Sequence, residues 1–453
     1  MTKLIKYESS EKVITFFNNR GIDCGFDGID YYGNSSLMWA LRKRNKEIAM
    51  MLLELKDEEG KYVLEKKHLD LQNNEKCRAL DLAIQNEAFE VAKVLLERGV
   101  DCTYEDCNEV TPLMRALLRR NEEIALILLN MRNDEGKYML EKKYLDLQNN
   151  KTSRALDLAI KFEALDAVKA LLDRGVECAY ELNDQWTPLM SALDRGNEEI
   201  ALMLLNMKDE EGKNILEKKH LDLENDKKVR ALDLAIKSDS YEAAKVLLER
   251  GVDCTYEQRD MRTPLIWAIR KSQEKMALML LNLKDEEGKY ILDMEHLELE
   301  NTEKSRALDI AIEVGDIETA KLLLDRGVEI SYQTDDKWTP LMRSLEEESE
   351  EISLRLLSAK DEEGNFILDK KHLILEGPGK ATALSLATSS DYMYAVAKVL
   401  VDRGVEYSYR MGNELNYLKI ENLENNLENL KIDIKLIQET LNEILKKLSN
   451  DVK

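Results

Sequence analysis

The sequence predicts an all-α fold in which helix pairs stack into a solenoid with hairpin-like fingers, followed by a coiled-coil helix at the C-terminus. The solenoid is predicted by an internal period of 76 residues that is marked twice in each period. A fixed period indicates one supersecondary unit that buries its apolar face against identical neighbours. The first marker, Thr-Pro-Leu, starts at Thr111, Thr187, Thr263 and Thr339, with a weaker copy at Ser35, and the second, Arg-Ala-Leu or Thr-Ala-Leu, starts at Arg78, Arg154, Arg230, Arg306 and Thr382.

Each marker begins a helix pair, and residues 187–205 show why. Thr187 is a good N-cap, and Pro188 suits the first helical position because the N–H there has no partner within the helix. Apolar residues then recur at three- and four-residue spacing, which predicts one buried face, and the pattern repeats from Ile200 to Leu205. In the shorter half of the period the second helix ends at Arg-Gly, where glycine can adopt a left-handed conformation and arginine suits the negative end of the helix.

The shorter half is 33 residues long and resembles an ankyrin repeat. Ala-Leu-Asp-Ile-Ala at 307–311, Gly-Asp at 315–316 and Arg-Gly-Val at 326–328 stand in the order typical of that family. The longer half, 43 residues, resembles it as well, so ten copies follow one another in phase. Several glycines between the two helices are replaced, and the family's usual histidine is replaced by Met38, Met114, Met190 and Met342.

The boundaries follow from the period. Residues 1–34 resemble the second half of a repeat, and we expect an N-terminal cap in which Phe16 and Phe17 cover the apolar end of the stack. The solenoid is predicted over residues 35–409.

Each longer repeat has ten extra residues after its second helix. A glycine turn and a short alternating segment predict either an elongated hairpin or a helical turn within one. The five insertions lie near Gly60, Gly136, Gly212, Gly288 and Gly364.

The pattern changes near Asn413, and residues 413–450 predict a coiled-coil helix that joins several chains. Nine aliphatic residues there alternate at three- and four-residue spacing, which is the seam of a coiled coil. The alternative is one amphipathic helix that folds back to cap the last repeat. The predicted oligomerisation residues are Ile420, Leu423, Leu427, Leu430, Ile434, Ile437, Leu441, Ile444 and Leu448.

Composition limits the possible functions. The net charge is −23 and basic clusters are local, so general binding to nucleic acid or to anionic membranes is not expected. No apolar run approaches the roughly 20 residues that span a bilayer, and no signal peptide is visible. We therefore expect a cytoplasmic protein. No phosphate-binding, dinucleotide or nucleophile motif is present, which predicts a protein that is not an enzyme and needs no cofactor.

Metal binding is not expected either. The histidines occupy one repeat position and should lie about 20 Å apart or more, too far to share an ion. The acidic turn that begins at Asp57 lacks the spaced ligands of a calcium loop. Four cysteines are equivalent and too far apart for disulfides, so we expect small buried side chains. The histidines are His68, His220, His296 and His372, and the cysteines are Cys24, Cys102, Cys178 and Cys254.

The resemblance implies a binding function, because ankyrin-repeat proteins typically bind other proteins on a concave face made by first helices and finger tips. Tryptophan and arginine are enriched at binding hot spots, so those that differ between copies are candidates, although some tryptophans could instead pack between fingers. Charge also changes from Arg42-Lys43-Arg44 to Glu346-Glu347-Glu348, which would orient an extended partner. The candidate partner-binding residues are Trp39, Arg42, Arg115, Arg119, Trp186, Trp267, Arg270, Trp338 and Arg343.

The predicted function is an interaction scaffold that binds a protein partner and forms a homo-oligomer through 413–450. Two alternatives stay open. The repeats of neighbouring chains could contact one another in a self-assembling structural protein. The chain could also be an effector delivered into another cell.

Overall fold

The computed structural model describes residues 29–405, except 58, 183–184, 258–262 and 303. Contacts between Cα atoms divide the chain into two compact units, 1–254 and 255–453. Regular structure in the described ranges consists of helices and isolated antiparallel bridges, with no strand among them, so the predicted all-α class is confirmed. Most of the predicted cap and the whole predicted coiled coil, 413–450, lie outside the described residues.

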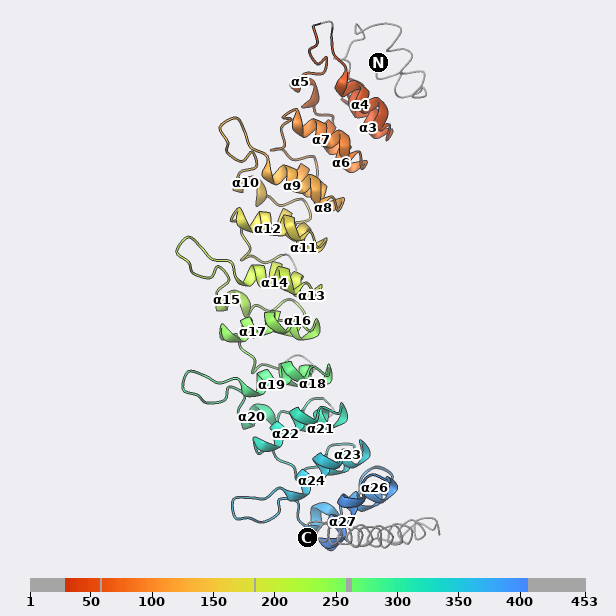
Figure 1. Cartoon of the computed structure of the whole chain (residues 1–453), viewed down its shortest axis with the longest axis vertical. Helices are drawn as coiled ribbons and strands as arrows, with labels where there is room; N and C mark the ends of the chain where they lie inside the picture. The colour runs from red at the N-terminus through yellow and green to blue at the C-terminus, as the bar shows by residue number, and fades with distance from the viewer. Residues whose placement is uncertain (1–28, 58, 183–184, 258–262, 303, 406–453) are drawn as a thin grey trace, which may run out of the picture. The chain divides into compact units, whose positions relative to one another are not determined.

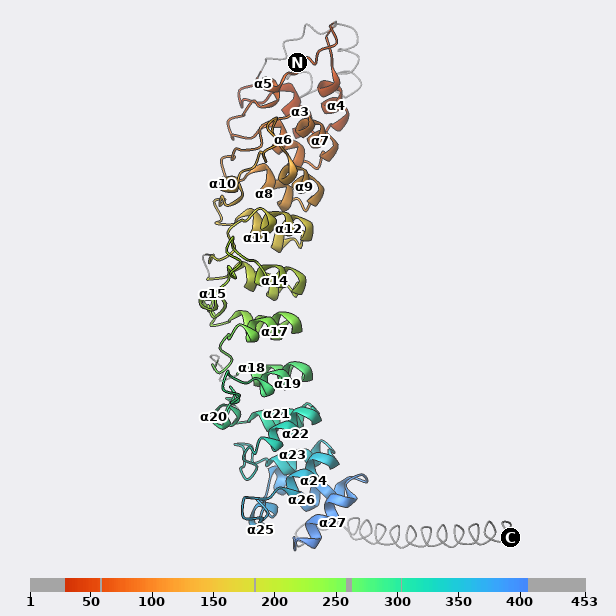
Figure 2. The same ribbon diagram turned by 60° about the vertical axis from the view of Figure 1, so that its left-hand side comes forward.

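Unit 1 contains six helix pairs in its described part (Figures 1 and 2). The first helices pack side by side in one row, and the second helices form an adjoining row. The first helices are α3 (Ser36–Arg42), α6 (Ala79–Gln85), α8 (Pro112–Leu118), α11 (Ala155–Lys161), α13 (Pro188–Asp194) and α16 (Ala231–Lys237). The second helices are α4 (Lys46–Glu54), α7 (Phe89–Glu97), α9 (Glu122–Asn130), α12 (Leu165–Asp173), α14 (Glu198–Leu205) and α17 (Tyr241–Glu249).

Unit 2 repeats this arrangement with four pairs in its described part. Its first helices are α18 (Pro264–Arg270), α21 (Ala307–Glu313), α23 (Pro340–Glu346) and α26 (Ala383–Ser389). Its second helices are α19 (Glu274–Asn282), α22 (Ile317–Asp325), α24 (Glu350–Ser358) and α27 (Tyr394–Asp402). A short 3-10 helix, η1 (Pro378–Lys380), precedes α26.

The predicted helix starts are confirmed. Thr187 caps α13, its hydroxyl accepts a hydrogen bond from the Met190 N–H at 3.1 Å, and Pro188 follows at the first helical position. Ser35 caps α3 in the same way through the Met38 N–H at 3.3 Å. The weaker copy of the marker therefore starts a helix like the others, because a serine hydroxyl satisfies the same backbone donor.

The core lies between the two rows of helices. Leu204 on α14 and Ala192 at the centre of α13 are fully buried. Burying one leucine side chain stabilises the fold by about 2 kcal/mol, and the small alanine lets neighbouring first helices approach closely. The replaced inter-helix glycines keep the glycine conformation, since Arg120 and Glu348 both adopt a left-handed backbone with φ of 54° and 52°.

The segment after the second helix of each longer repeat contains a hairpin, as predicted, but its helical turn follows the hairpin rather than lying within it. A hairpin comes first: the N–H of Val63 donates to the carbonyl of Leu55 at 3.0 Å, and an antiparallel bridge joins Lys56 and Tyr62. One turn of helix then leads toward the next repeat. The equivalent one-turn helices are α5 (Lys66–Leu69), α10 (Lys142–Leu145) and α15 (Lys218–Leu221) in unit 1, and α20 (Met294–Leu297) and α25 (Lys370–Leu373) in unit 2.

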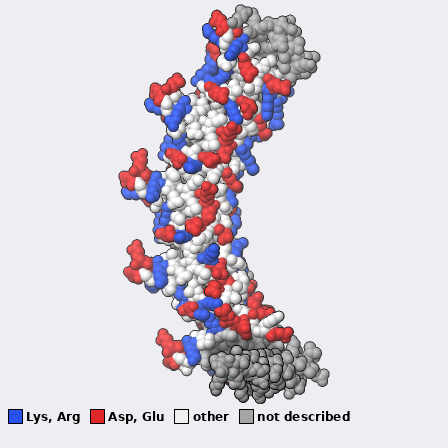
Figure 3. Space-filling view, viewed as in Figure 1, with Lys and Arg blue, Asp and Glu red and all other residues white. Residues whose placement is uncertain are grey.

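Within each unit the hairpins project beyond the second helices on one side (Figure 1). Their tips are acidic and exposed (Figure 3). In the first hairpin the carboxylate of Asp57 accepts from the N–H groups of Glu59 and Lys61, at 3.0 and 2.8 Å. The acidic turn is therefore closed by its own backbone donors.

Candidate functional site

An arginine from each shorter repeat binds the hairpin of the longer repeat before it. Arg174, just after α12, donates to the carbonyl of Leu129 at 2.6 Å and to that of Leu140, and its guanidinium lies 3.7 Å from the centroid of the Tyr138 ring. Because Leu129 lies in the last turn of α9 and Leu140 directly follows the hairpin, this one side chain attaches the hairpin at its base. Equivalent contacts are made by Arg98, Arg250, Arg326 and Arg403, which with Arg174 we call the hairpin-binding arginines.

The sequence had suggested only that these arginines suit the negative ends of their helices. Burial lowers the pKa of Arg174, which agrees with a guanidinium held among carbonyl groups rather than beside carboxylates. The sequence did contain a partial sign of this arginine–hairpin contact, because four of the five hairpins have an aromatic residue at the position that stacks on the arginine. These residues are Tyr62, Tyr138, Tyr290 and Phe366.

A second recurring group supports the first helices of the shorter repeats. The Asp157 carboxylate accepts from the Arg154 N–H at 2.8 Å and from the Tyr180 hydroxyl at 2.7 Å, and the Arg154 guanidinium lies 3.9 Å from the centroid of the Tyr180 ring. Burial raises the pKa of Asp157, although both hydrogen bonds favour the charged form. The same three residue types meet at Asp81, Tyr104 and Arg78 and at Asp309, Tyr332 and Arg306.

Five-residue turns precede the first helices, and we call them the turn fingers. In the turn finger 106–110 the Asp106 carboxylate accepts from the N–H groups of Asn108 and Val110, at 2.8 and 3.0 Å. Turn fingers and first helices together carry the candidate binding residues. The turn fingers and first helices lie apart from the insertion hairpins, which follow the second helices.

At the start of unit 1, Trp39 is half-buried and its indole N–H donates to the Asp30 carboxylate at 3.0 Å. Arg42 pairs with Glu75 at 2.5 Å on the surface. Tyr31, in the same turn finger as Asp30, is 89% exposed. The hydrogen bond to Asp30 thus fixes the orientation of Trp39, while the Tyr31 ring remains accessible.

Arg115 is largely buried and contacts three polar side chains of its own chain. Its side chain is 12% exposed, and it bonds Asp81 at 3.2 Å, Gln85 at 3.3 Å and also Asp106. Burial raises the pKa of the Asp81 carboxyl, although Arg115, the Arg78 N–H and the Tyr104 hydroxyl all favour its charged form. This guanidinium is therefore needed to neutralise a buried carboxylate, whatever else it contacts.

The other candidates are divided between the units. In unit 1, Arg119 is exposed and Trp186 is half-buried at the end of a turn finger. In unit 2, Arg270 is exposed on α18, and Trp267 and Trp338 are half-buried. Partner binding by these residues remains a prediction, and so does oligomerisation through Ile420 to Leu448, which lies outside the described residues.

Arg343 occupies the position of Arg115 but has different surroundings. Its side chain is 12% exposed, and its nitrogens lie 3.7 Å from carboxylate oxygens of both Glu313 and Asp336. Glutamate at 313 thus replaces the neutral Gln85 of unit 1.

A model of a known protein family matches the repeats of this chain. The family model described as "Ankyrin repeats (3 copies)" matches residues 56–136, 135–219, 177–258 and 308–411, more than half of the chain. The chain belongs to the ankyrin-repeat family. Ankyrin repeats are protein–protein interaction modules, and the family is generally non-enzymatic.

Two ankyrin repeat proteins of fowlpox virus (strain NVSL) are similar to this chain. FPV223 is 36% identical over 112 residues, which are 24% of this chain and 70% of FPV223. FPV014 is 27% identical over 139 residues, 30% of this chain and 29% of FPV014, so the chain spans less than a third of that relative. The crystal structure of the ankyrin repeat domain of Bcl-3 aligns at 22% identity and a TM-score of 0.39, covering 55% of this chain and 99% of that chain.

Two histidines of the inserted segments, His68 and His220, help to cap their one-turn helices. Nδ1 of His220 accepts from the Glu217 N–H at 3.0 Å, and His68 does the same with Glu65 at 2.9 Å. In α20 the cap is Asp293, whose pKa is lowered by its hydrogen bonds to His296.

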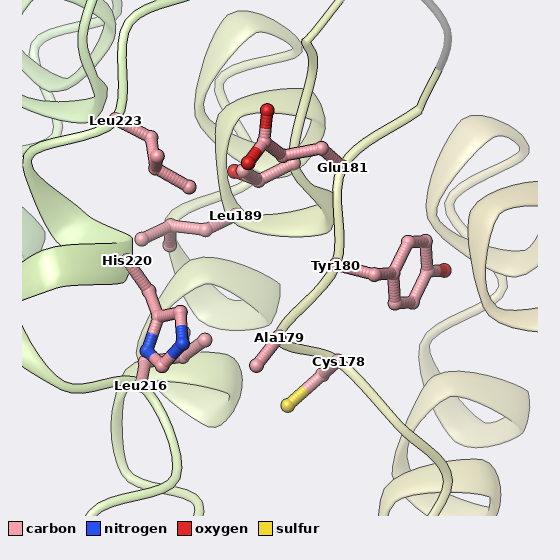
Figure 4. Close-up of a pocket in the computed structure, with 9 residues that line it drawn as sticks. Cys178, Ala179, Tyr180, Glu181, Leu189, Leu216, His220 and Leu223 are labelled. Atoms are coloured by element: carbon pink, nitrogen blue, oxygen red, sulfur yellow. The ribbon is translucent and has the colours of Figure 1, made fainter.

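His220 also borders a cavity of about 40 Å³ shared with Cys178 of the preceding repeat (Figure 4). The volume suits about one water molecule. Burial raises the pKa of the Cys178 thiol to about 11, so the thiol is neutral near pH 7. Within the described ranges, no group of three or more His, Cys, Asp or Glu side chains could hold a metal ion. No helix in that part of the chain is long and apolar enough to cross a membrane.

Proposed function

We propose that this chain is a non-enzymatic scaffold that binds partner proteins through its first helices and turn fingers, and that residues 413–450 join several copies. The observation that carries the proposal is a contrast between positions. The capping residues, core alanines and hairpin-binding arginines recur in copy after copy, whereas one first-helix position varies among Trp39, Arg115, Ser191, Trp267 and Arg343.

This contrast supports partner binding because the fold specifies the recurring residues and leaves the varying ones open. Trp39 and Trp267 are half-buried large aromatic side chains on first helices. Such side chains supply much of the binding energy of protein interfaces. Arg115 is the exception, since its contacts to Asp81 and Asp106 give it a structural role.

Multivalency is supported by the uninterrupted seam from Ile420 to Leu448. Joining several chains raises avidity through effective concentration without adding any contact to the partner. The alternative is that this segment caps the last repeat of its own chain.

The oligomer is tested by measuring mass in solution for the full chain and for a chain that ends at Met411. A defined oligomer that becomes a monomer on truncation is expected. Two monomers would show instead that the segment caps the solenoid and that the scaffold is monovalent.

Partner binding is tested by cross-linking proteins to the full chain in its source cells and comparing Trp39→Ala and Trp267→Ala variants by quantitative mass spectrometry. The control is Val401→Ala, which alters an exposed apolar residue on the second helix α27. A partner that uses the first helices should be depleted in the tryptophan variants and retained in the control. Equal recovery in all three would place binding elsewhere.

A further inference from the structure

One surface of the ankyrin repeat carries opposite charge in the two units. The ends of α8 in unit 1 and α23 in unit 2 are equivalent, because they lie three periods apart in sequence. Lysine and arginine gather over the end of α8, and aspartate and glutamate over the end of α23 (Figure 3). The charge is reversed between Arg119 and Glu347 and between Arg120 and Glu348. Negative charge is added where Glu313 replaces Gln85 and Glu346 replaces Leu118.

The basic patch consists of Arg119, Arg120 and Lys161, all exposed. The guanidinium of Arg120 lies 5.2 Å from the centroid of the Phe162 ring, and Nζ of Lys161 lies 5.8 Å from it. The ring therefore brings the cations of two neighbouring first helices together. The acids nearest in sequence are Glu163, which follows Phe162, and Glu122 and Glu123, which follow Arg120. The Glu122 carboxylate accepts from the Ala167 N–H at 3.0 Å, and Glu123 pairs with Lys93 at 2.7 Å.

The acidic patch consists of Glu313, Glu346, Glu347 and Glu348, also exposed. Burial, followed by repulsion from Glu346 and Glu313, raises the pKa of Glu347. Arg343 lies beside this patch, but its side chain is only 12% exposed and it also faces Asp336. The patch therefore presents an excess of negative charge that Arg343 alone does not balance.

The fold itself does not require this difference. Thr111 and Thr339 cap the two helices through the same hydrogen bond, at 3.2 and 3.1 Å. Arg120 and Glu348 have nearly the same left-handed backbone. Since identical backbones accept either sign of charge, the charges are free to serve binding.

We infer that the acidic patch of unit 2 binds the basic patch of unit 1 in a second copy of this chain. Arg119 and Arg120 in one patch and Glu347 and Glu348 in the other stand at equivalent positions and carry opposite charge. The two patches therefore attract each other, whereas each repels a second copy of itself. Such a contact joins two different surfaces. One chain of the pair therefore keeps a free basic patch and the other a free acidic patch, so the assembly can grow head to tail. This association is independent of the proposed oligomer through 413–450.

The test uses sedimentation equilibrium of the full chain over a range of concentrations, at about 0.05 M and about 0.5 M salt. Screening shortens the range of charge interactions from roughly 10 Å at 0.1 M to 3 Å at 1 M. We expect mass that grows with concentration at low salt only. The test variants are R119E/R120E and E347R/E348R. Both should fold, because each puts into one helix end the residue type that the equivalent helix end already carries.

Each double variant should weaken association by about tenfold or more, because two attractions become repulsions. An equimolar mixture of the two should regain association, and a chain with all four substitutions should regain it alone. The control is Lys213→Glu, an exposed charge reversal on an insertion hairpin. Mass that does not grow with concentration, growth unaffected by either double variant, or a mixture that fails to recover would overturn the inference. A fixed, salt-insensitive oligomer that persists in every variant would still support the role of 413–450.

Discussion

The guanidinium of Arg174 stacks 3.7 Å from the centroid of the Tyr138 ring and donates to the Leu129 carbonyl at 2.6 Å. The arginine and the hairpin belong to neighbouring repeats. If no shorter repeat with its arginine followed this hairpin, the carbonyls of Leu129 and Leu140 would lack this donor. The alternation of long and short repeats therefore has a physical reason, because each long repeat needs the arginine of the short one that follows.

Replacing Arg174 by alanine should release the second hairpin. Loss of two charge-assisted hydrogen bonds and one ring contact should destabilise this region by about 2 kcal/mol. Arg174→Lys should lose most of the same stability, since an ammonium group cannot present a planar fork to two carbonyls. Hydrogen exchange of residues 131–140 should become faster in both variants. Lys169→Ala, on the same helix, is the control and should leave exchange unchanged.

Replacing Arg115 by methionine should strongly destabilise the third repeat. The change leaves the buried Asp81 carboxylate without its cation, which costs about 3–5 kcal/mol in comparable cases. A double variant with Asp81→Asn should recover part of this loss, and denaturant unfolding of the three proteins measures both effects. A loss below about 1 kcal/mol would show that Asp81 does not depend on Arg115.

The destabilisation by Arg115→Met should also depend on pH. Burial raises the pKa of Asp81, so the folded state binds this proton more tightly than the unfolded state. Without the Arg115 charge, which lowers the pKa of Asp81, the folded pKa of this carboxyl is higher in the variant than in the parent protein. The penalty is therefore complete above the folded pKa of the variant and decreases as pH falls through it toward the folded pKa of the parent protein. Unfolding free energies should show a smaller loss at about pH 5 than at about pH 8. The double variant with Asp81→Asn should lack this dependence.

The helix starts could be predicted from the sequence, because Thr187 and Pro188 act on backbone groups within one turn. The role of Arg174 could not, since its acceptors, the carbonyls of Leu129 and Leu140, lie in the preceding repeat. The structural contacts of Arg115 could not be predicted for a related reason. Its position varies between copies, which suggested partner binding, while the local pattern gives no sign of its contacts to Asp81 and Asp106.

Cysteine reactivity provides a separate test of the fold. Burial raises the pKa of the Cys77, Cys102 and Cys254 thiols to about 12, whereas Cys107 is exposed. Because the thiolate is the reactive form, Cys107 should react with iodoacetamide at pH 8 about 100-fold faster than these three. The measurement is peptide mass spectrometry in a Cys24→Ser background, with denatured protein as the control for full labelling. Rapid modification of Cys102 in native protein would contradict its burial.

The third hairpin should be stabilised by adding an aromatic residue. Asn214 stands where the other four hairpins have tyrosine or phenylalanine, and Arg250 meets its side-chain carbonyl oxygen at 3.3 Å in place of a ring. Asn214→Tyr should let the guanidinium stack as Arg174 does on Tyr138, adding about 0.5–1 kcal/mol at this partly exposed site. Hydrogen exchange of residues 207–215 should slow accordingly. Asn214→Leu separates the two possible causes, because it adds apolar surface without a ring: equal slowing in both variants would mean that burial rather than the arginine–ring contact stabilises the hairpins.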